Sequence, residues 1–216
     1  YDKHIKESET LVKEKQPSIG RVKLKVLNYL VKKRVKNVSE IGAGVGIVAK
    51  YFQNMHVNYQ GIELDGKTVE RAQAAGLHIK KGDFTILGNL PNQQDAIVAF
   101  EVIEHLQGLH ELFLILQETL KQDGYFGFTV PNYDKRLNFK NPKTKIYQSP
   151  PPIHLNFFTV ESIQNIATIY GFKVVFCTEK RFPYLLWRRK STYKNLIKGI
   201  LGQYRGPTIS AVIQKK

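Results

Sequence analysis

Residues 38–48 read as a short buried strand, a glycine-rich turn and the start of a helix. The turn carries three glycines at alternate positions, namely Gly42, Gly44 and Gly46. A glycine has no Cβ atom, so the backbone can turn tightly there and come close to a ligand. The first turn of the following helix presents N–H groups without intrahelical partners. Together these features predict a site for a nucleotide-like cofactor.

The spacing of the glycines distinguishes between cofactors. A dinucleotide fingerprint reads G-x-G-x-x-G/A, because its third small residue lets helix and strand pack closely. Here that third position holds Ile47, which is too bulky, and Glu40 leads into the turn. The stretch resembles motif I of the Rossmann-like S-adenosylmethionine (SAM) methyltransferases, written E/D-x-G-x-G-x-G. In that family the acid contacts the methionine end of SAM, directly or through water, and the glycines admit its adenosine. The resemblance therefore implies that the cofactor is bound by Glu40, Gly42, Ala43, Gly44 and Gly46.

Strand-like and helix-like segments alternate along the chain, which favours a mostly parallel sheet covered by helices on both faces. Strands are expected at 38–42, 57–63, 77–80, 95–100, 125–130, 172–178 and 208–213. Helices are expected at 4–15, 19–34, 67–75, 109–121 and 159–170. Gln122-Asp123-Gly124 reads as a C-terminal helix signal and Thr159 as an N-cap with Ser162 at N3. The resemblance implies a doubly wound α/β sheet of seven strands in the order 3-2-1-4-5-7-6, with the last strand antiparallel.

We expect one methyltransferase domain over residues 1–216, since this length suits a single core. Two segments are expected to cover the site as lids. One is residues 1–36, with the N-terminal helices. The other is residues 131–156, a proline-rich stretch without clear periodicity, because a long irregular segment inside a compact domain is often functional.

Acidic residues follow the second and third strands. The segment Gly61–Asp65 resembles motif II of the same family, in which a carboxylate accepts hydrogen bonds from both ribose hydroxyls. Glu63 occupies the usual place, with Leu64 beside it, and Asp65 is the alternative. Gly82-Asp83-Phe84 resembles the adenine-binding motif. There Asp83 accepts a hydrogen bond from the adenine amino group and Phe84 packs on the ring.

The segment Phe100–Leu106 follows the buried fourth strand, at the edge where doubly wound sheets bind ligands. Phe100 and Glu101 are expected at the cofactor. Glu101, Glu104 and His105 are spaced i, i+3, i+4, so a helical turn would gather them on one face. The segment resembles the V-x-E-H-L motif of a methyltransferase subgroup that includes ubiquinone-biosynthesis O-methyltransferases and bacterial small-molecule and glycan methyltransferases. Residues 120–124, 128–132 and 154–159 resemble further motifs of the same subgroup, with a departure at Gln122-Asp123, where Pro-Gly is commoner.

His154 lies in the last of these matches, so the predicted catalytic residues are Glu104, His105 and His154. Three interpretations of this group stay open. Two carboxylates and two imidazoles suit a divalent metal that would lower the pKa of a substrate hydroxyl. A histidine can instead act as general base without metal. The third interpretation is that Glu104 and His105 only fix the loop by hydrogen bonding.

The net charge of the chain indicates what kind of partner it binds. The net charge is +15, from 33 basic and 18 acidic residues, which favours an acidic partner or reflects a lysine-rich soluble surface. Residues 182–190 place aromatics beside basic residues, a composition that suits a membrane interface or a loop packed on the sheet. The single cysteine, Cys177, favours a reducing compartment and reads as a buried strand residue. We therefore expect a cytoplasmic protein, with peripheral membrane contact as an alternative.

The resemblance implies a SAM-dependent methyltransferase that releases S-adenosylhomocysteine. The expected acceptor is an acidic small molecule, glycan or lipid-like compound, methylated on oxygen. Two alternatives stay open: an RNA methyltransferase, favoured by the net charge, and a non-catalytic SAM-binding protein on the same fold.

Overall fold

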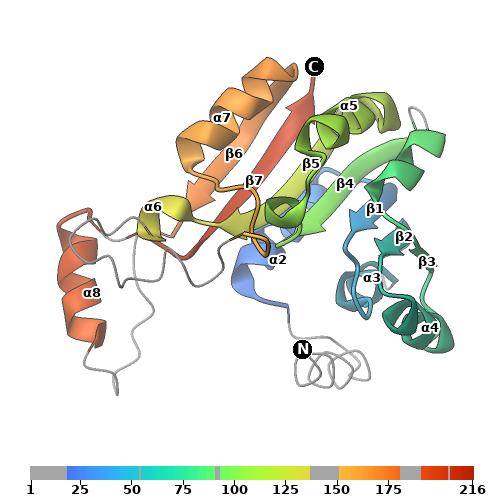
Figure 1. The fold of residues 1–216 in the computed structure, drawn as a ribbon, viewed down its shortest axis with the longest axis horizontal. Coiled ribbons are helices and arrows are strands. Elements are labelled where there is room, and N and C mark those ends of the chain that lie inside the picture. The colour runs from blue at the N-terminus through green and yellow to red at the C-terminus, as the bar shows by residue number, and fades with distance from the viewer. Residues whose placement is uncertain (1–18, 54, 91–92, 137–150, 181–190, 204) are drawn as a thin grey trace.

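The computed structural model describes residues 19–53, 55–90, 93–136, 151–180, 191–203 and 205–216 (Figure 1). One seven-stranded sheet runs in the order β3-β2-β1-β4-β5-β7-β6, which confirms the expected order. The strands are β1 Asn37–Ile41, β2 Asn58–Glu63, β3 Ile79–Lys81, β4 Gln94–Phe100, β5 Leu120–Pro131, β6 Phe172–Glu179 and β7 Thr208–Lys215. β7 pairs antiparallel with both β5 and β6, while β1 to β5 pair parallel.

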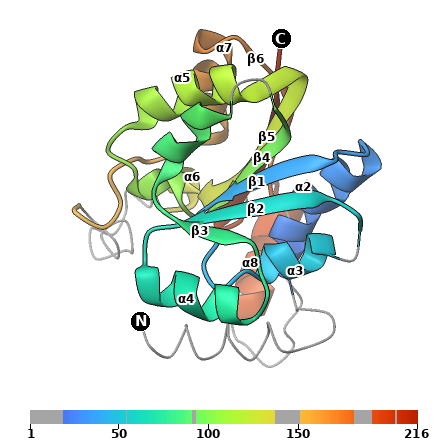
Figure 2. The same ribbon diagram turned by 90° about the vertical axis from the view of Figure 1, so that its right-hand side faces the viewer.

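Helices cover both faces of this sheet (Figure 2). The α-helices are α2 Arg21–Lys32, α3 Ile47–Gln53, α4 Gly66–Ala74, α5 Leu109–Thr119, α6 Tyr133–Arg136, α7 Val160–Ile169 and α8 Ser191–Ile200. Two 3-10 turns, η1 Phe84–Asn89 and η2 Ile103–His105, follow β3 and β4. No helix among the described residues combines the length and apolarity needed to cross a bilayer.

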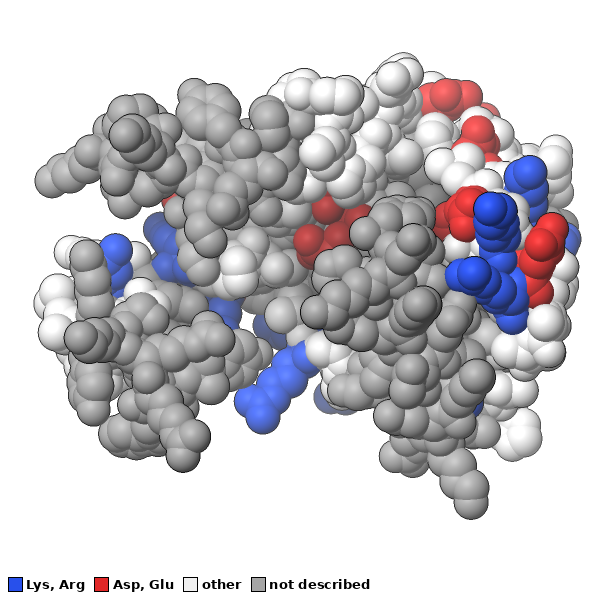
Figure 3. All heavy atoms as spheres, turned by 60° about the horizontal axis from the view of Figure 1, so that its bottom comes forward, with Lys and Arg blue, Asp and Glu red and all other residues white. Residues whose placement is uncertain are grey.

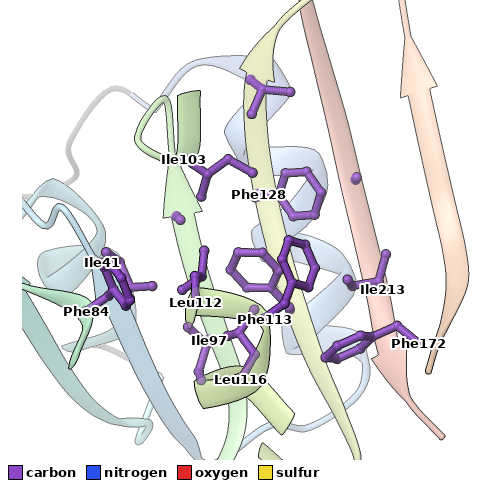
Figure 4. Close-up of a cluster of buried hydrophobic side chains, with 14 of the residues drawn as sticks. Ile41, Phe84, Ile97, Ile103, Leu112, Phe113, Leu116, Phe128, Phe172 and Ile213 are labelled. Carbon is purple, nitrogen blue, oxygen red and sulfur yellow. The ribbon is translucent and has the colours of Figure 1, made fainter. Parts of the chain in front are cut away.

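Strand β4 shows why the core has two layers. Its side chains alternate between the faces of the sheet, as the period of two requires. Ala96, Val98 and Phe100 join the cluster under α2, α3 and α4. Ile97 and Ala99 join the cluster under α5 and α7. Figure 4 shows this second cluster, in which large aromatic residues fill the space between helix and sheet.

The junction between α5 and β5 corrects one expectation. The helix ends at Thr119, and β5 already begins at Leu120. The predicted C-terminal signal Gln122-Asp123-Gly124 therefore lies inside the strand, and the prediction that it ends the helix is wrong. The register of β5 against β4 shifts between Gln94 and Ala96, and Asp123 adopts a φ of 62°. The turn residues thus form an irregularity in the ladder, which glycine and aspartate tolerate.

Other local expectations are confirmed. The Thr159 hydroxyl oxygen caps α7 by accepting from the Ser162 backbone N–H, and the Ser162 hydroxyl oxygen accepts from the Thr159 backbone N–H. The helix expected at 19–34 is α2, which buries Val26, Leu27 and Leu30 against the sheet. The helix expected at 4–15, most of the proline-rich stretch 131–156 and the segment 182–190 lie outside the described residues. The two lid assignments stay predictions.

Candidate active site

The glycine turn lies between the end of β1 and the start of α3. Gly42, Gly44 and Gly46 have φ values of 70°, 53° and 86°, so each uses a conformation that other residues rarely adopt. A Cβ atom built on Gly44 meets no atom within 4 Å. The backbone at Gly44 therefore borders open space, as a closely approached ligand requires.

Two close contacts fix the position of the turn. A Cβ built on Gly61 of β2 would lie 2.6 Å from the Ala43 Cβ. The N–H groups of Gly42 and Ala43 both donate to the Ile62 carbonyl, at 2.9 and 3.0 Å. Gly61 belongs to the predicted motif II, but this role was not predicted, because a glycine in a strand indicates close packing only in general terms.

Glu40 is buried beneath the turn, with 3% of its surface exposed. Its carboxylate accepts a hydrogen bond from the Tyr59 hydroxyl. Burial raises the pKa of Glu40 to about 8, although the Tyr59 hydrogen bond and the Lys23 charge act in the opposite direction. The pKa of Tyr59 is also raised, by burial first and by Glu40 second. A buried carboxyl group at this place is a strong candidate for cofactor contact.

Glu63 ends β2 with its carboxylate turned toward the glycine turn. One oxygen accepts from the Gly44 N–H at 2.9 Å, and the other accepts from the Asp65 N–H at 3.1 Å. Asp65 has a different task, because its carboxylate caps α4 through the N–H and hydroxyl of Thr68, at 3.0 and 2.6 Å. These bonds lower the pKa of Asp65. The structure thus turns Glu63, and not Asp65, toward the glycine turn.

The remaining predicted cofactor residues differ in exposure. Leu64 is 67% exposed beside Glu63. Asp83 is exposed and begins η1 by accepting from the Thr85 N–H at 2.9 Å. Phe84 is buried in the core cluster under α5, so its ring packs inside the protein. Phe100 is buried at the end of β4, and the Lys23 Nζ lies 5.4 Å from its ring centroid.

The loop after β4 lies directly against the glycine turn. A Cβ built on Gly42 would lie 2.4 Å from the Val102 Cγ2 atom. Glu101 adopts a φ of 60° and donates its N–H to the Thr129 carbonyl at 2.9 Å. A non-glycine residue in this conformation stores strain, which is concentrated at functional sites. This conformation breaks the helical geometry that would place Glu101 on one face with Glu104 and His105.

Three of the four predicted polar side chains converge. Among the described residues, possible ligand atoms of Glu104, His105 and His154 all lie within 4.8 Å of one another, and Glu101 is not in this group. Glu104 and His154 are buried, whereas His105 is exposed. A Glu104 oxygen lies 3.7 Å from the His105 Nε2 atom. His105 Nδ1 lies 2.6 Å from the Ile153 carbonyl oxygen, so this nitrogen carries a proton and donates.

Asn156 joins the two segments that supply this group. Its side-chain amide donates to the carbonyls of Ile103 and Leu106, at 3.1 and 2.6 Å. The backbone N–H groups of Leu155 and Asn156 both donate to the Glu104 carbonyl, at 2.8 and 3.0 Å. Asn156 lies in one of the motifs that resemble the subgroup, but this role was not predicted. Its contacts join segments far apart in the sequence, so no local pattern indicated them.

The comparisons with known proteins bear on the family and the fold. A family model described as a methyltransferase domain matches residues 14–176, so the chain belongs to this methyltransferase family. No curated protein matches the sequence. The expectation of a Rossmann-like SAM-dependent methyltransferase is confirmed by this family and by the fold. The ubiquinone-biosynthesis subgroup stays a prediction.

Solved structures share the fold at low identity. A SAM-dependent methyltransferase from Archaeoglobus fulgidus is 19% identical, with a TM-score of 0.66 over 91% of this chain and 95% of that one. One from Mesorhizobium loti is 14% identical, with a TM-score of 0.63 over 91% and 99%. The cyclase SpnF is 16% identical, with a TM-score of 0.60 over 88% and 80%. Because this fold also carries cyclase chemistry, the reaction must be argued from the site.

Proposed function

We propose that this methyltransferase transfers the methyl group of SAM to an oxygen of an acidic small-molecule, glycan or lipid-like acceptor beside Glu104, His105 and His154. The contact between Gly42 and Val102 carries this proposal. It joins the cofactor turn to the loop that bears two of the three polar groups. An acceptor held at these side chains would therefore lie next to the cofactor.

The residues around the turn fit the cofactor. The open space at Gly44 admits adenosine, and Glu63 presents a carboxylate already oriented by two N–H groups for the ribose hydroxyls. Leu64 offers an exposed apolar side chain for the adenine, with Asp83 as acceptor for its amino group. Glu40 beneath the turn is the partner for the methionine end. SAM supplies an electrophilic methyl group, released as its sulfonium becomes the thioether of S-adenosylhomocysteine.

His105 is proposed as the general base. Because Nδ1 donates to the Ile153 carbonyl, the neutral ring keeps its lone pair on Nε2. That nitrogen can accept the hydroxyl proton as the acceptor oxygen forms its bond to the methyl carbon. The resulting imidazolium would be stabilised by Glu104, whose carboxylate oxygen is 3.7 Å from Nε2. His154 packs against His105 and orients it.

A divalent metal is the second candidate for this group, because one glutamate and two histidines offer ligand atoms within 4.8 Å of one another. The bond from His105 Nδ1 to a backbone carbonyl is the arrangement that supports metal-bound histidines. A chelator distinguishes the metal-dependent mechanism from the metal-free general base. Turnover that is lost in chelator and restored by Mg²⁺ or Mn²⁺ supports the metal, and full turnover in chelator supports the base.

Calorimetry tests the proposed function itself. We expect S-adenosylhomocysteine to bind and NAD not to bind, since Ile47 stands where the dinucleotide fingerprint needs a small residue. At about 100 times its Kd, the ligand should add about 2.7 kcal/mol to the free energy of unfolding. Micromolar binding of NAD with no heat from S-adenosylhomocysteine would reject the proposal.

A further inference from the structure

A cavity of about 200 Å³ lies at the carboxyl end of β6, between the start of β7 and the first turns of α2. Its lining brings together cations and hydroxyl groups from three elements: Arg21, Lys25 and Lys180, with Thr178, Thr208 and Ser210. Figure 3 brings the bottom of Figure 1 forward and shows basic side chains to the left of and below a central acidic group, with a mixed basic and acidic group at the right. The cavity is not part of the group formed by Glu104, His105 and His154.

The charge of the cavity is positive. Glu179 is the carboxylate among the described lining residues, and it is bound by Arg205 and the Asn132 side chain. The three cations of the lining therefore outnumber its single negative charge. Burial and the nearby Arg21 charge lower the pKa of Lys180, which reports cations held close together. A bound anion would relieve this repulsion.

The cations at the start of α2 are electrostatically unfavourable for the helix. A helix N-terminus carries partial positive charge and favours acidic residues. Yet the first turn of α2 has no acidic residue, its N-cap Gly20 provides no side-chain hydrogen bond, and Arg21 and Lys23 lie within that turn. A second basic cavity, of about 260 Å³, lies at the amino edge beside the C-terminus of α2, where lysines complement the dipole and Lys121 pairs with Asp95. Only the first cavity places cations where the helix itself disfavours them.

Hydroxyl groups complete the donor set. The Lys25 Nζ donates to the Thr178 Oγ1 at 2.7 Å, and Thr178 and Ser210 hydroxyls lie 3.4 Å apart. Ammonium, guanidinium and hydroxyl donors around one space suit the several oxygens of a phosphoryl group. A Cβ on Gly206 would lie 2.9 Å from the Lys180 backbone nitrogen, so close packing holds this lysine in place.

The same helix connects the cavity to the cofactor side. Lys23 lies over the Phe100 ring at the end of β4, two residues from both Arg21 and Lys25. We infer that this cavity binds a phosphoryl group of the methyl acceptor, through Arg21, Lys25 and Lys180 with the hydroxyls of Thr178 and Ser210. The inference rests on the proposed function, because it gives the acceptor of that reaction its acidic group.

Calorimetry with inorganic phosphate at low salt is the test, on the full chain and on the variants Arg21→Gln and Lys25→Gln. Each variant removes one charged donor and should weaken phosphate binding about tenfold or more. Lys32→Gln, in the last turn of the same helix, is the matched control and should bind phosphate like the wild type. S-adenosylhomocysteine affinity is measured in parallel and should stay unchanged in all three variants.

Two further arms identify the source of the phosphoryl group. Binding of glycerol 3-phosphate that depends on Arg21 and Lys25 indicates a soluble acceptor. Retention on vesicles of phosphatidylcholine with phosphatidic acid, with the same dependence, indicates a lipid headgroup. Phosphate binding that is absent or equal in both variants and the wild type overturns the inference, whereas intact S-adenosylhomocysteine binding in that case leaves the proposed function standing.

Discussion

His105 and His154 meet edge to face, with ring centroids 4.8 Å apart and ring planes at 65°. They come from the loop after β4 and from the segment before α7, which hydrogen bonds to Glu104 hold together. The pair is therefore built by tertiary contacts at the carboxyl edge of the sheet, where this class of fold binds ligands.

Replacing His105 with Ala should lower kcat about 10²–10⁴-fold and remove the imidazole limb of the pH–rate profile, because the proposed base is lost. His154→Ala should lower kcat less, since His154 orients the base. S-adenosylhomocysteine affinity, measured by calorimetry, should stay near the wild-type value in both. His110→Ala is the control, because His110 is exposed on α5 and bonds to Tyr170. Full activity in both site variants would contradict the assignment.

Gly44→Val should abolish cofactor binding while the protein still folds. The new side chain would enter the open space at the turn, and the φ of 53° adds about 1–2 kcal/mol of backbone strain. Gly76→Val provides a matched control, because Gly76 has a φ of 75° and nothing within 4 Å of its built Cβ, but lies at the end of α4. Thermal unfolding and calorimetry on both variants separate strain from blockage. Equal cofactor affinity in the two variants would argue against a site at Gly44.

Glu63 and Asp65 should give opposite phenotypes. Glu63→Ala should weaken S-adenosylhomocysteine binding by about 1.5–3 kcal/mol, because a charged acceptor for the ribose hydroxyls is lost. Asp65→Ala should lower the Tm with little change in affinity, because Asp65 caps α4. Calorimetry and thermal unfolding on each variant check both outcomes. A loss of affinity confined to Asp65→Ala would move the ribose role to that residue.

Glu40 should make the protein less stable as pH rises. Its pKa of about 8 in the folded state lies above the ordinary glutamate value of 4.5, so the folded state binds more protons between these values. The stabilisation is present below about pH 4.5 and is lost as pH rises toward 8, by at most about 1.4 kcal/mol per pH unit. Glu40→Gln should flatten this part of the curve of unfolding free energy against pH. Denaturant unfolding at several pH values measures it, and identical slopes in both proteins would contradict the burial argument.

The order of elements was predictable because strands and helices alternate with clear hydrophobic patterns, and the glycine turn fixed the first crossover. The capping of α7 by Thr159 and Ser162 is local in sequence and was equally readable. The end of α5 could not be predicted, because Gln122-Asp123-Gly124 suits a strand irregularity as well as a helix end. Pairing with β4 decided between the two.

The site residues were likewise predictable where the structure is local in sequence and not where it depends on tertiary contacts. Motif I placed its glycines correctly at the end of β1, since their conformations depend on neighbours in the chain. The expectation that Glu101 shares a face with Glu104 assumed helical geometry, but the φ of 60° at Glu101 reverses the chain before η2 begins. The bonds of Asn156 to the Ile103 and Leu106 carbonyls join distant segments, and spacing along one sequence carries no signal for such contacts.

The buried Glu40 also affects how the cofactor is taken up. SAM carries a sulfonium and an ammonium group, and a cation beside a protonated carboxyl favours its ionised form. With a pKa of about 8 before binding, Glu40 near neutral pH would then release a proton to the buffer as the cofactor enters. The proton of Glu40 is thus replaced by the positive charge of the cofactor. Because binding releases this proton, the affinity for SAM should rise as pH rises toward 8. The heat of binding will depend on the ionisation enthalpy of the buffer.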